Sequence, residues 1–311
     1  MLKIAVVGCG GIGNAHLNSW SSIDGVKIVA AVDIIEQRAK AAAEKFGCTA
    51  YTSHKDLPDD IDIVSVVTPP AEHYKISKDC LERGFNVFSE KPLTLDEKEG
   101  EELDGIAKAR GLQLGVGFKM RFEPIFNEAK KYLGEIGKLR TIVSTKEQAF
   151  NPRPDGVWVT ETGAMYELSI HDFDLITFIT GLKPQEVLYS KVGHRFGWKK
   201  EDSFNIVADY GDGVTAQLSG LYAVSSTFCF RDLAFTFIGD KGYIRIERPD
   251  RIVIHTDEFR VVEVPAAETS AFVLELTHFK NAVEGKETNT LTAEDAICAT
   301  AFINEAYRKG C

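Results

Sequence analysis

Residues 4–13 read I-A-V-V-G-C-G-G-I-G, and this stretch decides the fold. Its first four residues form an apolar run typical of a strand, which enters a turn with the glycine spacing G-x-G-x-x-G. A segment compatible with a helix follows (Ile12–Trp20), and a second apolar run (Val26–Val32) ends at Asp33. This order predicts the strand, turn, helix and second strand of a dinucleotide-binding unit.

Each glycine of the turn has a separate physical role. Gly8 permits the tight turn out of the strand, Gly10 lets the backbone approach a pyrophosphate, and Gly13 allows the helix to pack closely on the strand. Gly11 and Ile12 open the helix, whose free N–H groups and positive dipole end attract phosphate. The alternative is a glycine-rich turn in another kind of α/β protein. The flanking strand, the helix and the acidic residue favour the dinucleotide-binding interpretation.

Asp33 indicates which dinucleotide is bound. It lies twenty residues past Gly13, where a carboxylate can accept hydrogen bonds from both ribose hydroxyls of an adenosine. A 2′-phosphate would meet a negative charge there, so the pattern favours NAD over NADP. Arg38 is close enough in sequence to keep NADP as an alternative, unless it is a solvated residue of the following helix.

The composition fits a protein of two domains without a nucleic-acid or membrane partner. The chain has 311 residues, 44% of them apolar, and a formal net charge of −10. No basic stripe marks a nucleic-acid surface, and no apolar run is long enough to span a membrane. Met1-Leu2-Lys3 enters the first strand directly and leaves no room for a signal peptide, so we expect a cytoplasmic protein. The six cysteines form no C-x-x-C pair, and we expect free thiols and no metal.

Residues 1–120 alternate strand and helix patterns. Helical patterns separate the further apolar runs Ile61–Val67, Asn86–Ser89 and Gln113–Val116. This alternation predicts a doubly wound parallel sheet with helices on both faces, whose ligands lie at the carboxyl ends of the strands. One crevice there would collect the glycine turn, Asp33, Thr68-Pro69-Pro70 and Glu90-Lys91-Pro92.

The pattern changes after about residue 120, and alternating segments dominate 121–311. Turns such as Gly211-Asp212-Gly213 join these segments as hairpins, which predicts an α+β domain with a large, mostly antiparallel open sheet. Helices are expected near Ala164–Thr180, Ser270–Glu284 and Thr292–Arg308. Because helices cover one face of such a sheet and leave the other, we expect a homo-oligomer formed through the C-terminal sheet.

Two groups of residues could carry chemistry. Lys91 follows a strand on the cofactor side, where a partly desolvated lysine can donate to a substrate hydroxyl; a solvated surface lysine is the alternative. Glu167, His171 and Asp174 would share one face of a helix, and a histidine oriented by a carboxylate is an effective acid–base pair. The alternatives are an ion pair on a solvated helix or a buried histidine with a structural role. We expect Asp174 to be structural, and no metal site here, because the helix turns Asp172 away.

The order of these motifs resembles that of the Gfo/Idh/MocA family (glucose–fructose oxidoreductase, inositol dehydrogenase and rhizopine catabolism) along the whole chain. The resemblance rests on the glycine turn, Asp33, Thr68-Pro69-Pro70 with His73, Glu90-Lys91-Pro92, Phe118–Pro124 and Gly163–Asp174. The stretch Ile170–Asp174 looks most like the inositol 2-dehydrogenase branch. The resemblance implies a Rossmann domain over 1–120 and a substrate-binding and oligomerisation domain over 121–311. It also implies an NAD-dependent dehydrogenase that oxidises a secondary alcohol of a cyclitol or sugar.

The resemblance further implies roles for individual residues. Lys91 and His171 match catalytic residues, and Glu167 takes the place of the aspartate that works with the histidine. Positions that line the cofactor are matched by Thr68, Pro69, His73, Glu90 and Lys91. Positions that bind substrate are matched by Lys91, Glu167, His171 and Arg121, the last of which is otherwise a surface residue of the following helix.

Two departures from the family pattern bear on the substrate. Glu167 is one methylene longer than the usual aspartate, which could re-aim His171, and Lys119 stands where an asparagine is common. Lys119 would suit an acidic or phosphorylated substrate, unless it is a surface lysine. Two other functions stay open: an enzyme that retains NAD and oxidises a sugar transiently to allow elimination or hydrolysis, and a nucleotide-sensing regulator. Lys91 and His171 argue against the regulator, which has no need of them.

Overall fold

The computed structural model describes residues 1–149, 158–223 and 231–310. The chain forms two compact units: Met1–Lys119 with Thr269–Ile297, and Met120–Glu268 with Cys298–Cys311. The sequence prediction placed all of 121–311 in the second domain, whereas the segment Thr269–Ile297 groups with the first unit. The reason is apolar packing, since Phe279 of this segment stacks edge-on against Phe88 of the first unit.

The first unit is built on a six-stranded parallel sheet with the strand order β3-β2-β1-β4-β5-β6. Its strands are β1 (Leu2–Val7), β2 (Val26–Val32), β3 (Thr49–Tyr51), β4 (Ile63–Val66), β5 (Asn86–Ser89) and β6 (Leu114–Val116). Its helices include α1 (Gly11–Ser21), α2 (Glu36–Phe46), α3 (His73–Glu82), α4 (Glu97–Arg110) and α8 (Ala271–Val283). This strand order is that of the doubly wound dinucleotide-binding fold, as the sequence predicted.

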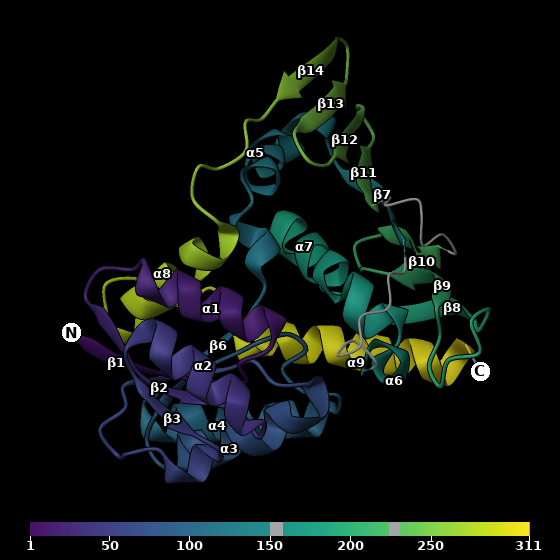
Figure 1. Cartoon of the computed structure of the whole chain (residues 1–311). Helices are drawn as coiled ribbons and strands as arrows, with labels where there is room; N and C mark the ends of the chain where they lie inside the picture. Colours follow the sequence, from purple (N-terminus) through teal and green to yellow (C-terminus); the bar gives the residue numbers. More distant parts are fainter. Residues whose placement is uncertain (150–157, 224–230, 311) are drawn as a thin grey trace. The chain divides into compact units, whose positions relative to one another are not determined.

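The sheet of the first unit is covered on both faces. Helices α1 and α2 lie on one face with α8 beside α1, and α3 and α4 cover the other (Figure 1). Ile4, Ala5 and Val6 of β1 are therefore fully buried, which explains why this strand is an uninterrupted apolar run. From β1 the strands β2 and β3 are added on one side, and β4, β5 and β6 on the other. Such folds bind their ligands where the strand order changes direction, which here is between β1 and β4 in the middle of the sheet.

The second unit is built on an eight-stranded sheet with the order β14-β13-β12-β11-β7-β10-β9-β8. Its strands are β7 (Leu139–Ala149), β8 (Glu186–Gly193), β9 (Ser203–Asp209), β10 (Thr215–Ala223), β11 (Arg231–Gly239), β12 (Tyr243–Glu247), β13 (Arg251–His255) and β14 (Phe259–Glu263). Only β7 and β10 pair in parallel among the strands of this sheet, so the predicted mostly antiparallel sheet is confirmed. The sequence analysis missed β8, whose alternation is broken by a register shift between Val187 and Tyr189.

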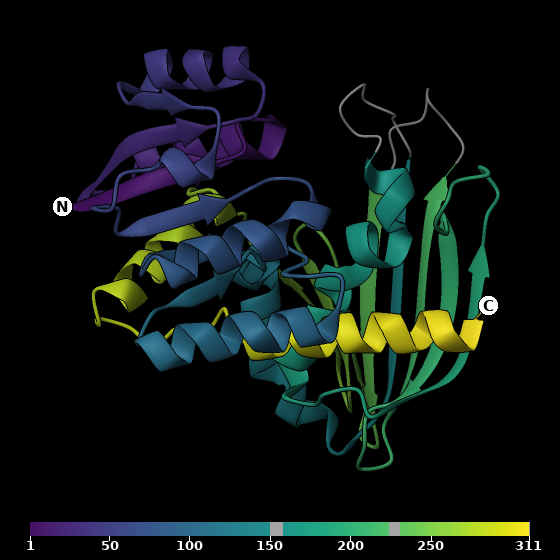
Figure 2. The same ribbon diagram turned by 90° about the horizontal axis from the view of Figure 1, so that it is seen from below.

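The helices of the second unit include α5 (Pro124–Tyr132), α6 (Trp158–Thr162), α7 (Ile170–Thr180) and the part of α9 (Ala293–Gly310) that follows Ile297. The yellow C-terminal end of α9 lies against the sheet, where Lys309 donates to Glu186 and to the backbone carbonyl of Val187 on β8 (Figure 2). The helix predicted over Ala164–Thr180 is in fact two segments, because a π-helical turn, η5 (Met165–Ser169), precedes α7. In the described part of the chain, no helix has the length and apolar character needed to cross a membrane.

Candidate functional site

The glycine turn after β1 has the geometry that the sequence predicted. Gly8 has a φ of +102°, a conformation that only glycine adopts without strain. A Cβ at Gly13 would lie 1.9 Å from the carbonyl oxygen of Gly8, so this glycine lets α1 pack against the end of β1. At Gly10 and Gly11 a Cβ would meet no atom within 4 Å, and the adjoining Ile12 side chain is exposed. The outer side of the turn is therefore open to a ligand, while its inner side is closely packed.

Asp33 lies at the carboxyl end of β2 and is tied to the glycine turn. Its carboxylate accepts hydrogen bonds from the backbone N–H groups of Cys9, at 2.9 Å, and Ile35, at 2.8 Å. These bonds hold the acidic side chain beside the turn, where a ribose would follow a pyrophosphate bound at the helix N-terminus. Cys9 itself is a buried free thiol, and burial raises its pKa to about 12, so it is a poor nucleophile.

His73 joins the loops that follow β4 and β5. Its Nε2 lies 2.7 Å from the carbonyl oxygen of Thr68, and its Nδ1 lies 2.7 Å from that of Pro92. Burial lowers the pKa of His73, although both carbonyl oxygens oppose this effect. The Thr68 hydroxyl is buried and has no hydrogen-bond partner among the described residues, so it could be satisfied by a ligand. Pro69 beside it is exposed.

Glu90 and Lys91 follow β5, and the peptide bond between Lys91 and Pro92 is cis. The Glu90 carboxylate accepts a hydrogen bond from the backbone N–H of Lys91, at 3.1 Å, and lies 3.0 Å from the Nε2 atom of His16 on α1. Burial favours a raised pKa for Glu90, but the contact with His16 and the charges of Lys119 and Lys91 outweigh it, and the pKa is lowered. An ionised Glu90 therefore holds the backbone at Lys91.

In the second unit, two buried ion pairs flank His171. The guanidinium of Arg121 donates from Nε to both carboxylate oxygens of Asp174, at 2.9 and 3.1 Å, and the Nζ of Lys146 donates to Asp172 at 2.9 Å. Arg121 is only 6% exposed, so its interpretation as a surface residue is wrong. The Asp174 carboxylate is thus engaged in an ion pair inside the second unit, which supports the structural role expected for it.

The π-helical turn η5 carries Glu167 immediately before α7, which carries His171. His171 is 6% exposed, whereas Glu167 is half-buried. A solvated helix is therefore the wrong description of this segment. Single π-turns within helices are rare and often occur at functional sites.

Sequence reasoning missed two buried residues of the first unit, His16 and Glu275. Together with Glu90 they place one nitrogen and two carboxylate groups within 4.8 Å of one another, and they are the one such group found among the described residues. No local motif could have identified them, because α1, β5 and α8 are far apart in the sequence and only the fold joins them.

Two models of protein families match most of the chain. Residues 2–118 match the model described as an oxidoreductase family with an NAD-binding Rossmann fold. Residues 127–245 match the model of the GFO/IDH/MocA C-terminal domain. The first model falls within the first unit and the second within the second unit, which is the order that the motifs predicted.

Individual relatives are dehydrogenases of cyclitols and sugar nucleotides. The scyllo-inositol 2-dehydrogenase (NAD(+)) of Bacillus subtilis is 29% identical over 318 residues, which cover 95% of this chain and 90% of that protein. The UDP-N-acetylglucosamine 3-dehydrogenase of Acidithiobacillus ferrooxidans is 30% identical over 188 residues, covering 60% of this chain and 56% of that protein. In some of these comparisons, including the one with the Acidithiobacillus ferrooxidans enzyme, the chain spans little more than half the length of the relative. A solved structure of the Acidithiobacillus ferrooxidans enzyme has a TM-score of 0.86 at 23% identity, covering 98% of this chain and 97% of that one.

Proposed function

Since the two family models together match most of its length, the chain belongs to the Gfo/Idh/MocA oxidoreductase family, and we propose that it is an NAD-dependent dehydrogenase that oxidises a secondary alcohol of a cyclitol or sugar. The observation that carries this proposal is the carboxyl edge of the parallel sheet. There, neighbouring strands present the open glycine turn, Asp33, the Thr68 hydroxyl and the Glu90-Lys91 segment.

The residues at this edge fit NAD. Gly10 and Gly11 leave room for a pyrophosphate, and the N-terminus of α1 supplies N–H donors to it. Asp33 would accept the adenosine ribose hydroxyls, and its negative charge disfavours the 2′-phosphate of NADP. When bound, NAD supplies an acceptor for the hydride that leaves the alcohol carbon.

We assign the proton and charge steps to three side chains. His171 takes the proton of the substrate hydroxyl, and Glu167 on the preceding π-turn orients the imidazole. Lys91 hydrogen-bonds to the reacting oxygen and stabilises the negative charge that develops there. Arg121 would act through Asp174, by fixing the helix that carries His171, because its guanidinium is engaged in that buried pair.

The test is NADH formation with a panel of inositols, aldoses, sugar acids and sugar nucleotides, with NADP in parallel. Lys91→Ala and His171→Ala should each lower turnover by ~100-fold or more while NAD binding is retained. A matched control is Lys108→Ala, which removes an exposed lysine paired with Asp104 on α4 and should leave turnover unchanged. Unchanged turnover in both Lys91 and His171 variants would refute the assignment. Tightly retained NAD without net NADH release would favour the enzyme that keeps its cofactor.

We also propose that the chain self-associates through the second sheet. Apolar side chains on its outer strands are exposed, namely Leu188, Tyr189, Phe259 and Val261. Exposed apolar residues on an open sheet are typical of subunit interfaces. Light scattering after size-exclusion chromatography measures the assembly, and a monomer at high protein concentration would refute this proposal.

A further inference from the structure

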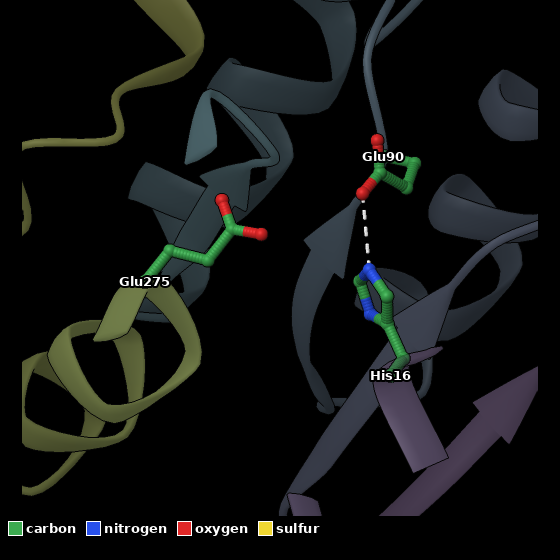
Figure 3. Close-up of side chains that lie close together, drawn as sticks. All are labelled: His16, Glu90 and Glu275. Atoms are coloured by element: carbon green, nitrogen blue, oxygen red, sulfur yellow. Dashed lines mark hydrogen bonds and ion pairs between the residues drawn. The ribbon is translucent and has the colours of Figure 1, made fainter. Parts of the chain in front are cut away.

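A buried carboxyl group without a hydrogen-bond donor lies next to Glu90. Glu275 extends from α8 toward Glu90 and His16, which come from the loop after β5 and from α1 (Figure 3). The Glu275 residue is fully buried, and neither of its carboxylate oxygens has a hydrogen-bond partner in the described part of the chain. An ionised carboxylate in such a place would cost several kcal/mol, so the group must be neutralised.

The surroundings of Glu275 are largely apolar. The ring of His16 packs between Phe88 and Phe272, with centroid distances of 5.7 and 5.5 Å. A Cβ at Gly117 would lie only 3.0 Å from the Glu90 carboxyl group, so the backbone closes another side. Two carboxyl groups thus share a small, water-poor space.

The charged groups that face this space come from every element around it. They are His16 on α1, Glu90 and Lys91 after β5, and Lys119 after β6. Lys119 also stacks on the Phe272 ring, with its Nζ 4.1 Å from the centroid. Burial raises the pKa of Glu275 well above its usual range, and the charge of Glu90 raises it further, against the opposing effect of Lys119. The pKa of Glu90, by contrast, is lowered.

We propose that Glu275 and Glu90 hold one proton between them, resident on Glu275, and that this pair positions the Glu90–Lys91 segment. Two close carboxyl groups cannot both ionise in a water-poor site, and the group with the better donors keeps the charge. Glu90 has those donors, in the Lys91 backbone N–H and His16, and His16 is itself held by the Ser65 hydroxyl at 2.9 Å. Glu275 is therefore a positioning residue, which acts on Lys91 through Glu90.

A divalent cation is the other way to neutralise the cluster, since one imidazole and two carboxylates could ligate one. The charges around the cluster favour the proton. The ammonium groups of Lys119 and Lys91 already offset the carboxylates, and a cation would have to bind beside them. With the proton on Glu275, the cluster needs no further charge.

The shared proton also predicts an effect of pH on kcat, and this prediction rests on the proposed function. As pH rises through the pKa of Glu275, a second negative charge forms beside Glu90 and repels it. Glu90 then loses its hold on the Lys91 backbone, and kcat should fall. Glu275→Gln keeps the shape and stays neutral at every pH, so it should keep kcat within about threefold of wild type near neutral pH and lose the alkaline fall.

The location of the proton is tested by infrared difference spectroscopy of the full-length protein in D₂O, which needs no activity. At neutral pH the wild type should show the carbonyl stretch of a protonated carboxylic acid, and Glu275→Gln should lack it. Glu258→Gln, which removes an exposed carboxyl group, should leave the band unchanged. In Glu90→Gln the band should persist but titrate away at lower pH than in wild type, because the neighbouring charge is gone. The Glu90→Gln variant keeps the test valid if Glu275→Gln does not fold.

The outcomes separate this inference from the proposed function. Absence of the band in wild type at neutral pH, or its presence in Glu275→Gln, would overturn the inference even if dehydrogenase activity is found. A divalent metal retained by the wild type and lost in Glu275→Gln, measured by elemental analysis, would also overturn it. A band that behaves as expected in a protein without dehydrogenase activity would support the shared proton and refute the proposed function alone.

Discussion

Alanine at Gly10 and alanine at Gly13 should damage the protein in different ways, although the two glycines are three residues apart. At Gly13 the new Cβ would lie 1.9 Å from the Gly8 carbonyl oxygen and 2.7 Å from its carbon, and both atoms belong to the backbone. Helix α1 must therefore shift away from β1. At Gly10 the Cβ would meet no protein atom within 4 Å, and the φ of −74° suits alanine. Only a bound pyrophosphate would meet it.

The expected magnitudes follow from these contacts. Overpacking of this kind costs ~1–3 kcal/mol or more, which is a large share of the ~5–15 kcal/mol by which a typical domain is stable. We therefore expect Gly13→Ala to lower the unfolding free energy by ~2 kcal/mol or more. Gly10→Ala should change it by less than ~0.5 kcal/mol, as open surface substitutions do. Its effect should appear in binding, where a loss of ~1.4 kcal/mol or more raises the Kd for NAD by about tenfold or more.

Urea unfolding measures the first effect, and calorimetric titration with NAD measures the second. Gly105→Ala is the matched control, since its Cβ also meets nothing within 4 Å and it lies inside α4, away from the turn. It should stabilise the protein by roughly 0.5–1 kcal/mol and leave NAD binding unchanged. Normal NAD affinity in Gly10→Ala would refute the approach of a pyrophosphate to this turn. Wild-type stability in Gly13→Ala would refute the packing role of that glycine.

Three further predictions concern other parts of the molecule. Asp33→Ser should narrow the preference for NAD over NADP by about tenfold, because the charge that repels a 2′-phosphate is removed; an unchanged ratio of the two Kd values would contradict this. Asp174→Leu should destabilise the second unit by ~3–5 kcal/mol, because it leaves the buried Arg121 guanidinium without its carboxylate. Adding Arg121→Met should restore most of this loss in the free energy of unfolding, measured by urea unfolding. Additive losses in the double variant would show that the pair is not coupled. Because the folded-state pKa of Glu275 is raised above 4.5, the stability that its proton contributes is fully present below pH 4.5 and is lost as pH rises through the folded-state pKa. Glu275→Gln should therefore gain stability relative to wild type as pH increases, and parallel unfolding curves across pH would contradict the shift.

Most of the first unit could be predicted from local sequence, because each element there carries its own signal. The strands β2 and β5 were predicted at their observed bounds, Val26–Val32 and Asn86–Ser89, and β1 within two residues, since buried parallel strands read as short apolar runs. The conformations at Gly8 and Gly13 also followed from the motif, because only a few backbone geometries connect a strand to a helix so tightly.

What the sequence could not predict depends on contacts between distant segments. The packing of α8 on the parallel sheet requires Phe279 to meet Phe88, and no periodicity within either segment reveals the other. The π-turn at Met165–Ser169 was hidden because a helix with one inserted residue keeps nearly the same apolar pattern. The same limit applies to Glu275, which in sequence is one acidic residue in an amphipathic helix and in the fold is a buried neighbour of Glu90.

The charged run on α7 shows how buried ion pairs can hold the helix that carries His171, the residue proposed as the proton acceptor. Successive residues of a helix point ~100° apart, so Asp172 and Asp174 face different directions on either side of the direction in which His171 points. Asp172 is held by Lys146 on β7, and Asp174 by Arg121 on η3 (Lys119–Phe122), and all four side chains are at most 5% exposed. Two anchors in different directions fix both the rotation of α7 about its axis and its height above the sheet. Buried pairs add little net stability, but they forbid alternative packings, since any rotation would leave a charge unpaired. The proposed acid–base role of His171 needs positional precision of this kind, because proton transfer tolerates only small errors in distance.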